Sequence, residues 1–299
     1  MNKYKGEFGL FLVAIVWGSG FVGTQLSLEG GLTPLQVITF RFLIGSILIN
    51  LIFFKTIKSN INKKAIKSGI ILGVILFIAF ALQTVGLLYT TASKNAFLTA
   101  VNVIVVPFIG FIVYKRKLDK ISIITSITTL IGIGIISLQN NFSINIGDLL
   151  TILCAILFGF HIFFTSEYSS DNNPFVLTSI QFITTFILSF ILQICVGEFS
   201  IDTNTSGYLG VLYLGIFTTT LAFLMQTLCQ SKVDSSKSAI ILSTEAVFGA
   251  IFSVVFLGEV LTYKMMLGSL MILLSIIGSE TKFEFLRNKS SENLENNNT

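Results

Sequence analysis

The stretch QTVGLLYTTASKNAFLTAVNVIVVP, residues 83–107, decides the fold, because the chain repeats it 143 positions later as QTLCQSKVDSSKSAIILSTEAVFGA, residues 226–250. Each copy has an apolar run, a short polar break that contains a shared lysine, and a second apolar run with a polar residue about two turns in. That polar residue is Asn102 in the first copy and Glu245 in the second. Identical residues pair as Gln83 with Gln226, Thr84 with Thr227, Ser93 with Ser236, Lys94 with Lys237 and Ala96 with Ala239.

The rest of each half repeats as well, with offsets that drift only at loops. A shift of 141 aligns Gly6-Glu7 with Gly147-Asp148, Gly18 with Gly159 and Thr24 with Thr165, and a shift of 140 aligns Pro34 with Pro174, Arg41 with Gln181 and Phe42 with Phe182. We therefore expect two related five-helix units, over residues 6–138 and 147–280.

The composition places the chain in a membrane. Hydrophobic residues make up 53% of it, charged residues 11%, and the mean hydropathy is +0.86. A chain of this kind has too few polar residues to cover its own surface in water. Apolar runs of about 20 residues suit helices that cross a hydrocarbon core of roughly 30 Å. Ten such runs are present, near 8–26, 35–54, 68–89, 95–114, 121–138, 148–166, 175–196, 208–229, 238–257 and 263–277.

The distribution of lysine and arginine orients the predicted bundle. With a cytoplasmic N-terminus, 16 of the 19 basic residues fall in cytoplasmic segments, and only Lys94, Lys264 and the intramembrane Arg41 do not. Five helices are an odd number, so the second half enters the membrane upside down relative to the first. The sequence therefore predicts an all-α integral membrane protein with ten transmembrane helices as a 5+5 inverted repeat. Both termini are cytoplasmic, and a disordered tail follows over 282–299.

The segment GSGFVG, residues 18–23, matches the G-x-G-x-x-G dinucleotide-binding pattern letter for letter. That pattern binds dinucleotides only between a strand and a helix, whereas these glycines lie within one apolar run. We interpret them, and the Gly69-x-x-x-Gly73 pair, as small residues that let helices approach closely.

Three stretches carry a family resemblance: WGSGF from Trp17, GLLYTTASKNAFLTAVNVIVVP from Gly86, and STEAVFGAIFSVVFLGE ending at Glu259. In their order, spacing and duplication they resemble the drug/metabolite transporter superfamily, EamA type, with two copies of its domain over about residues 6 to 280. The sequence departs from the family pattern at Arg116, where glutamate is frequent, and at Ala246, where proline is. The resemblance implies a central cavity lined by helices 1 to 4 and 6 to 9, with helices 5 and 10 peripheral.

An inverted repeat allows two halves to rock about a site at the midplane. We therefore expect a secondary active transporter that exports small metabolites or drugs, driven by gradients because the chain has no P-loop pattern. The alternative is an intramembrane lipid-handling protein, either a flippase or an enzyme. Enzyme chemistry needs converging acids, bases or metal ligands, and one histidine with one mid-helix carboxylate makes it the less favoured interpretation.

Polar side chains inside apolar runs are the candidate cavity residues, because their burial is costly unless they face a cavity or one another. Arg41 is interpreted either as a contact for an anionic group or as a structural arginine. His161 is either a packing residue or a proton carrier. The predicted substrate-binding or cavity-lining residues are Trp17, Arg41, Gln83, Asn95, Thr99, Asn102, His161, Gln181, Thr219, Gln226 and Glu245.

Glu245 is the candidate for energy coupling, because a carboxylate favours its neutral form in a dry site and its charged form near water or a cation. Arg41 is a possible partner, and a purely structural role for Glu245 is the other interpretation. Asn95, Thr99 and Asn102 form one polar stripe and Thr219, Gln226 and Gln230 another, and such stripes either line cavities or hold helices together. Trp17 and the many phenylalanines have two interpretations, as rings that stack on a ring-bearing solute or, the favoured one, as lipid-facing and interface residues.

The expected partners are a small-molecule solute and membrane lipids. The scattered basic residues do not suggest nucleic acid. Cys154, Cys195 and Cys229 lie inside apolar runs, so we expect neither disulfides nor a metal site, and no cofactor. The expected location is the cell membrane, as a multi-pass protein of a bacterial inner membrane.

Overall fold

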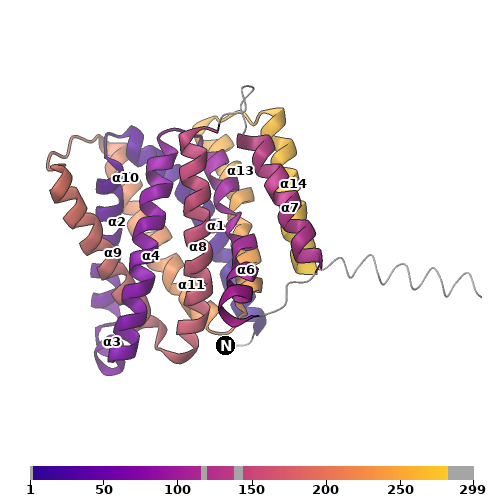
Figure 1. The fold of residues 1–299 in the computed structure, drawn as a ribbon. Coiled ribbons are helices and arrows are strands. Elements are labelled where there is room, and N and C mark those ends of the chain that lie inside the picture. The colour runs from indigo at the N-terminus through magenta and orange to yellow at the C-terminus, as the bar shows by residue number, and fades with distance from the viewer. Residues whose placement is uncertain (1–2, 116–119, 138–143, 282–299) are drawn as a thin grey trace, which may run out of the picture.

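The computed structural model describes residues 3–115, 120–137 and 144–281. The predicted tail, the family departure at Arg116 and the loop at Asn140 lie outside these segments. Within them the regular elements are helices, namely α1 Lys3–Glu29, α2 Pro34–Ile52, α3 Phe54–Asn60, α4 Lys63–Leu87, α5 Ala92–Thr99, α6 Asn102–Tyr114, α7 Lys120–Ser137, α8 Ile146–Asp171, α9 Pro174–Val196, α10 Thr205–Tyr213, η1 Leu214–Leu221, α11 Ala222–Gln230, α12 Ser235–Ser243, α13 Glu245–Leu257 and α14 Tyr263–Thr281 (Figure 1).

The described helices are long and apolar enough for a multi-pass membrane protein. Eight segments of at least 18 residues qualify as membrane spans, with α5 and α6 forming one, α10, η1 and α11 another, and α12 and α13 a third. Two shorter apolar helices cover Ile123–Ser137 in α7 and Tyr263–Ser275 in α14. The bundle is therefore entirely of the helical class that the sequence predicts.

Side-chain caps start the helices after short loops. The Thr33 side chain accepts a hydrogen bond from the Gln36 backbone N–H, and the Gln36 side chain accepts one from the Thr33 N–H, directly before Pro34 at the start of α2. Asn173 caps α9 before Pro174 through its side chain alone, which accepts a hydrogen bond from the Phe175 backbone N–H. Both prolines occupy the first helical turn, where their missing N–H costs nothing.

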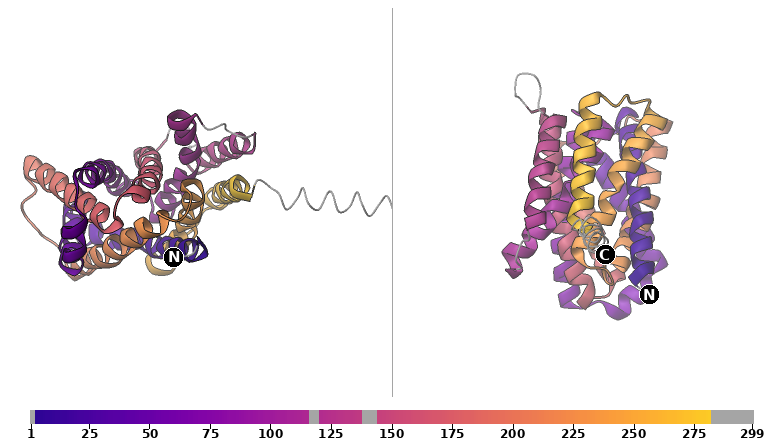
Figure 2. Two further views of the ribbon diagram at one scale, coloured as in Figure 1. Left: turned by 90° about the horizontal axis from the view of Figure 1, so that it is seen from below. Right: turned by 90° about the vertical axis from the view of Figure 1, so that its right-hand side faces the viewer.

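Equivalent helices of the two halves make equivalent contacts. α1 packs on α13, as α8 packs on α5 and α6; α4 packs on α9, as α2 packs on α10 and η1. α2 and α9 pack on each other. α7 and α14 also pair, and they lie side by side at one edge of the bundle (Figures 1 and 2). This peripheral position of the fifth and tenth predicted helices agrees with the family resemblance.

Glycines bring these helices close together in both halves. A Cβ atom on Gly18 would lie 2.5 Å from the Phe248 Cβ, and one on Gly159 would lie 2.8 Å from the Val105 Cβ. Gly18 and Gly159 are equivalent under the 141-residue shift, as Phe248 and Val105 are under the 143-residue shift. Gly73 packs on α9 in the same manner. The interpretation of these small residues as packing sites is confirmed.

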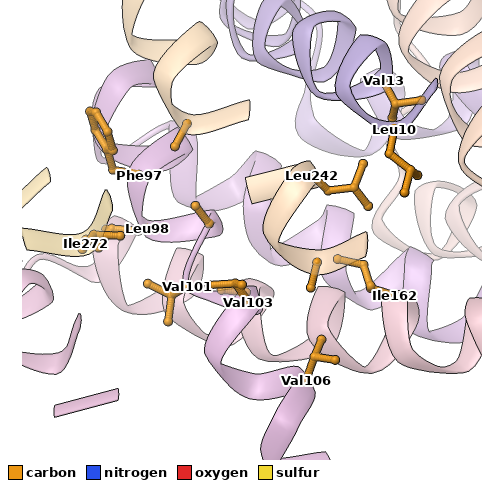
Figure 3. Packing of buried hydrophobic residues seen from close by; sticks show 14 of the residues in the cluster. Leu10, Val13, Phe97, Leu98, Val101, Val103, Val106, Ile162, Leu242 and Ile272 are labelled. Carbon is orange, nitrogen blue, oxygen red and sulfur yellow. The ribbon is translucent and has the colours of Figure 1, made fainter. Parts of the chain in front are cut away.

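Apolar side chains from both halves interlock in the centre of the bundle. Figure 3 shows Leu10 and Val13 of α1 with Leu242 of α12, and Val103 of α6 with Ile162 of α8, all within one buried cluster. Because lipid tails are as apolar as these side chains, close packing rather than escape from water holds such helices together.

Two spans are interrupted at equivalent positions near the middle of the bundle. α5 ends at Thr99 and α6 begins at Asn102, while α12 ends at Ser243 and α13 begins at Glu245. Tighter i→i−3 hydrogen bonds replace the α-helical ones at each break, such as Val103 N–H to Ala100 O and Val247 N–H to Thr244 O. Both breaks lie directly before the polar residues that the repeat places in register.

Proline removes a backbone hydrogen bond within a helix, so the sequence predicts a bend of this span near Pro107. The interruption of the span lies elsewhere. The interruption lies at Ala100–Val101, and Pro107 sits inside α6. The equivalent break at Thr244 has Ala250 where the first half has Pro107. Proline is therefore not what interrupts these helices.

Candidate functional site

A cavity of about 50 Å³ lies between the two halves at the level of the helix breaks. Its walls come from α1, α2, α4, α5, α6, α8, η1, α11 and α13. The lining residues are Trp17, Gly20, Phe21, Thr24, Arg41, Phe80, Gln83, Thr99, Asn102, Phe158, His161, Ile162, Thr218, Phe223, Gln226 and Glu245.

Arg41 is buried and held by a widened helix turn. Its Nε donates to Thr219 Oγ1 at 2.9 Å and its Nη2 to Thr218 Oγ1 at 3.0 Å. Both threonines belong to the π-helical segment η1, a rare conformation that recurs at functional sites. The guanidinium carbon lies 4.3 Å from the centre of the Phe80 ring, within cation–π range. Arg41 is thus fixed by two hydroxyls and a ring, and no carboxylate of the described residues forms an ion pair with it.

Glu245 is buried at the first residue of α13, where the helix dipole favours a negative charge. Its carboxylate has no hydrogen-bond or ion-pair partner among the residues that the structure describes. Arg41 lines the same cavity but does not form an ion pair with it. The partnership that the sequence allows between these two side chains is therefore not formed here.

Two amides of the cavity also lack partners. Neither side-chain atom of Gln226 is hydrogen-bonded within the described segments, and the same holds for Asn102 Oδ1. Buried polar atoms are nearly always paired, so unpaired ones call for a specific explanation. Together with Glu245, they give the cavity a donor and several acceptors that a solute can use.

The polar stripe on the fourth predicted helix divides into two roles. Thr99 lines the cavity and accepts a hydrogen bond from Gln83 Nε2 at 3.1 Å. Asn95 lies outside the lining, where its Nδ2 donates to Thr151 Oγ1 at 2.9 Å and so ties α5 to α8. On the other stripe, Gln230 Nε2 donates to the Ile162 carbonyl oxygen at 3.2 Å. Each stripe therefore has both roles. Thr99 and Gln226 line the cavity, whereas Asn95 and Gln230 join helices.

His161 reaches the cavity with a polar partner behind it. Its Nε2 lies 2.8 Å from Gln181 Oε1, where the imidazole N–H can donate to the amide oxygen. Gln181 itself lies behind the lining on α9. The arrangement orients the imidazole ring, whose centre is 5.8 Å from that of Phe223.

Aromatic rings of Trp17, Phe21, Phe80, Phe158 and Phe223 surround these polar groups. Trp17 Nε1 donates to the Thr218 carbonyl oxygen at 3.0 Å, and the Trp17 ring lies 4.8 Å from Phe223. Phe80 contacts both Phe158 and Phe223, with ring centres 5.3 and 6.0 Å apart. For these residues the interpretation as lipid-facing or interface side chains is wrong, because they pack inward around the cavity.

Eight of the eleven sequence candidates line the cavity, and Asn95, Gln181 and Thr219 lie behind it as hydrogen-bond partners. The missed lining residues are Gly20, Phe21, Thr24, Phe80, Phe158, Ile162, Thr218 and Phe223. The repeat register contains a signal for some of them. Trp17 and Phe158 are equivalent under the 141-residue shift, and Phe80 and Phe223 under the 143-residue shift. Duplicated aromatic residues, not polar ones alone, mark the site.

A multi-pass helical bundle that encloses a polar cavity between two equivalent halves belongs to the class of membrane transport proteins. The chain is a member of the EamA-like transporter family, which matches residues 4–138 and again residues 145–280. This membership confirms the resemblance drawn from the sequence, and it indicates a transporter rather than an enzyme.

Similar proteins bear transporter names. An uncharacterized transporter of Archaeoglobus fulgidus is 35% identical over 277 residues, which cover 93% of this chain and 86% of that protein. An uncharacterized transporter of Clostridium kluyveri is 26% identical over 293 residues, covering 92% of each chain. The uncharacterized transporter YdfC of Bacillus subtilis is 27% identical over 263 residues, covering 85% and 83%.

A solved crystal structure has the same fold. It superimposes with a TM-score of 0.72 over 95% of this chain and 99% of that one, at 14% sequence identity. At this identity the likeness concerns the arrangement of the helices alone.

Proposed function

We propose that this protein is a secondary active transporter that exports a small metabolite or drug by alternating access about the central cavity. The observation that carries the proposal is that Gln226 and Asn102 Oδ1 have no hydrogen-bond partner among the described residues, in a cavity between the two halves that Glu245 also lines. Such groups are costly in a membrane unless a cavity or solute serves them.

The architecture we propose is ten transmembrane helices in a 5+5 inverted repeat, with units over 6–138 and 147–280. The equivalent contacts of Gly18 and Gly159 support it, as do the equivalent breaks before Asn102 and Glu245. Discontinuous helices at the midplane are a feature of transporters built from inverted repeats. We further propose that both termini face the cytoplasm of a bacterial inner membrane.

The cavity favours a solute with an apolar or ring-bearing body and a charged end. Trp17, Phe80 and Phe223 offer ring faces. We propose that Arg41 contacts an anionic group and that Glu245 binds a cationic group or carries the coupling proton. Within the described segments neither Arg41 nor Glu245 forms an ion pair, so each side chain can meet a charged group of a solute.

The test is transport by the purified protein in liposomes. A panel of labelled amino acids, nucleobases, vitamins and cationic drugs is offered with and without a proton gradient. We expect at least one solute to move, and to move against its concentration gradient when the proton gradient is imposed. A protein that moves none of these classes but accelerates the transfer of fluorescent lipids between leaflets contradicts the proposal.

One observation favours that second candidate, a lipid-handling protein. A groove of about 390 Å³ opens on the outside of the bundle between α1, α10 and α13. Leu209 and Phe256 on its rim are largely exposed, so an acyl chain can reach it. The groove is apolar apart from groups such as Ser19 and Tyr213, which bond to each other at 2.5 Å. It lacks the unpartnered polar atoms of the central cavity, which therefore remains the favoured site.

A further inference from the structure

Among the ion pairs that join the two halves of the protein, two lie at equivalent positions. Lys94 Nζ of α5 lies 2.5 Å from Asp148 Oδ2 of α8, and Lys237 Nζ of α12 lies 2.8 Å from Glu7 Oε1 of α1. The 143-residue shift aligns the two lysines, and the 141-residue shift aligns the two carboxylates. Each pair therefore repeats the other, with a lysine from one half and a carboxylate from the other half.

The pairs lie at opposite ends of the bundle. Glu7 is in the second turn of α1, at the end marked N in Figure 1, which we call the N-side end. Asp148 is in the first turn of α8, which begins at the opposite, far end. From each lysine a half-helix leads inward to a break beside the cavity, α5 toward Asn102 and α12 toward Glu245. The cavity thus lies between the two pairs.

The cavity is too small to hold a solute in this structure. The cavity of about 50 Å³ has room for a few water molecules, at roughly 10–15 Å³ of such volume for each. Ligand pockets are larger, at roughly 300 Å³ or more. A solute can therefore enter only if one end opens, and the ion pair at that end spans the halves that must separate.

The far-end pair is the more firmly closed of the two. The Asp148 side chain is 0% exposed and that of Lys94 19%, against 19% for Glu7 and 35% for Lys237. Asp148 Oδ1 also accepts a hydrogen bond from Thr90 Oγ1 at 2.7 Å. The Glu259 carboxylate reinforces this end by accepting the backbone N–H groups of Ala92 and Ser93 at the start of α5.

We propose that Lys94–Asp148 and Lys237–Glu7 are the two gates of the transport route and that they part alternately. This inference rests on the proposed transport function. Water that enters an opening end hydrates both charges, so the separated pair is not left buried and uncompensated. Removing one charge takes away an attraction present only in the closed end, and the population shifts toward opening on that side.

The experiment measures access to the cavity, not transport. A single cysteine replaces the cavity-lining Thr99 in a background without the native cysteines. A membrane-impermeant thiol reagent is then applied to right-side-out and inside-out vesicles, which present opposite faces. Glu7→Gln is expected to raise the labelling rate from the N-side face about fivefold and to lower it from the far face, and Asp148→Asn to do the reverse.

The matched control is the pair between Lys64 and Asp171, which also joins the two halves at 2.9 Å but has side chains that are 66% and 60% exposed. Because water solvates both charges of an exposed pair, such a pair contributes little to holding the halves together. Lys64→Ala breaks it and is expected to leave labelling from both faces unchanged. Lys94→Gln and Lys237→Gln remove the other partner of each gate, so either variant replaces a carboxylate variant that does not fold.

An unchanged ratio of labelling between the two faces, or an increase on the same face for both gates, overturns the gate assignment and leaves the transport proposal standing. If the reagent labels the cysteine at position 99 from neither face in any of these variants, the proposed route through the cavity is wrong.

Discussion

At the scale of single residues, the two halves agree in backbone and differ in charge. Asn102 and Glu245 occupy equivalent first positions after equivalent helix breaks, and both face the cavity. Only Glu245 can gain or lose a proton. The two halves therefore supply two matching helix starts, and the difference between Asn102 and Glu245 places a titratable side chain at only one of them.

Glu245→Gln keeps the size and one acceptor oxygen of this side chain, replaces the other oxygen by an NH2 donor, and removes its proton exchange. If Glu245 couples transport to protons, solute-driven proton movement in proteoliposomes disappears, while exchange of labelled for unlabelled solute survives. Proton movement is measured with a pH-sensitive dye inside the vesicles. Unchanged pH dependence of transport in a normally folded variant removes Glu245 from the coupling mechanism.

Arg41→Lys tests the contact with an anionic group. Lysine keeps the charge but cannot donate in a planar fork to Thr218 and Thr219 or stack as well on Phe80. We expect the affinity for an anion-bearing solute to fall by about 1–3 kcal/mol, roughly 5- to 150-fold. Binding is measured by solute protection against thermal unfolding. Equal protection of both proteins assigns Arg41 a structural role.

At the scale of elements, the interruptions at Ala100–Val101 and at Thr244 are the features that form the site. They turn two long spans into four half-helices, and α13 packs on α5 while α12 packs on α6. Neither break contains glycine or proline. Packing between the crossing spans therefore determines where each helix is interrupted. The helix preferences of the residues at the breaks do not predict these positions.

Pro107→Ala tests whether helix packing or the proline itself shapes this span. Because Thr244 marks an equivalent break without a matching proline, we expect Pro107→Ala to keep the break and most of the transport rate. The added backbone N–H at this position can also bond to the preceding turn, so the melting temperature is expected to stay equal or rise. Loss of transport in a stable variant would show that proline itself shapes α6.

At the scale of the whole molecule, much of the fold follows from the sequence. The length of the apolar runs predicts the spans, and the repeat register aligns Lys94 with Lys237 and Glu7 with Asp148. The ion pairs Lys94–Asp148 and Lys237–Glu7 are not predictable from the repeat. The register shows which residues are equivalent, but it does not show which helices are neighbours. The π-helical turn at Thr218 and Thr219 and the inward aromatic rings also depend on contacts between spans. Polar candidates such as Gln226 are predictable from the sequence, because burying a polar side chain in a membrane is costly unless it serves a cavity or a partner.

The orientation in the membrane is predicted from the basic residues. Cysteines at Asn204 and Asn140, in a background without native cysteines, should react with an impermeant reagent from outside intact cells. Asn204 caps α10 at the far end, and Asn140 lies outside the described residues. A cysteine at Lys55 is expected to react only after the membrane is opened. The reverse pattern would invert the topology.

The central claim is that solute passes through the cavity between the two halves. Gly20 lines that cavity, and a Cβ there would already lie 3.3 Å from the Thr218 methyl group, so Gly20→Leu fills the space. The most direct measurement is counterflow of a labelled solute into preloaded proteoliposomes, with Val74→Leu on the exposed face of α4 as the control. We predict that Gly20→Leu abolishes counterflow although the variant protein elutes as a folded protein, and that Val74→Leu retains counterflow. Undiminished counterflow in Gly20→Leu would contradict the claim.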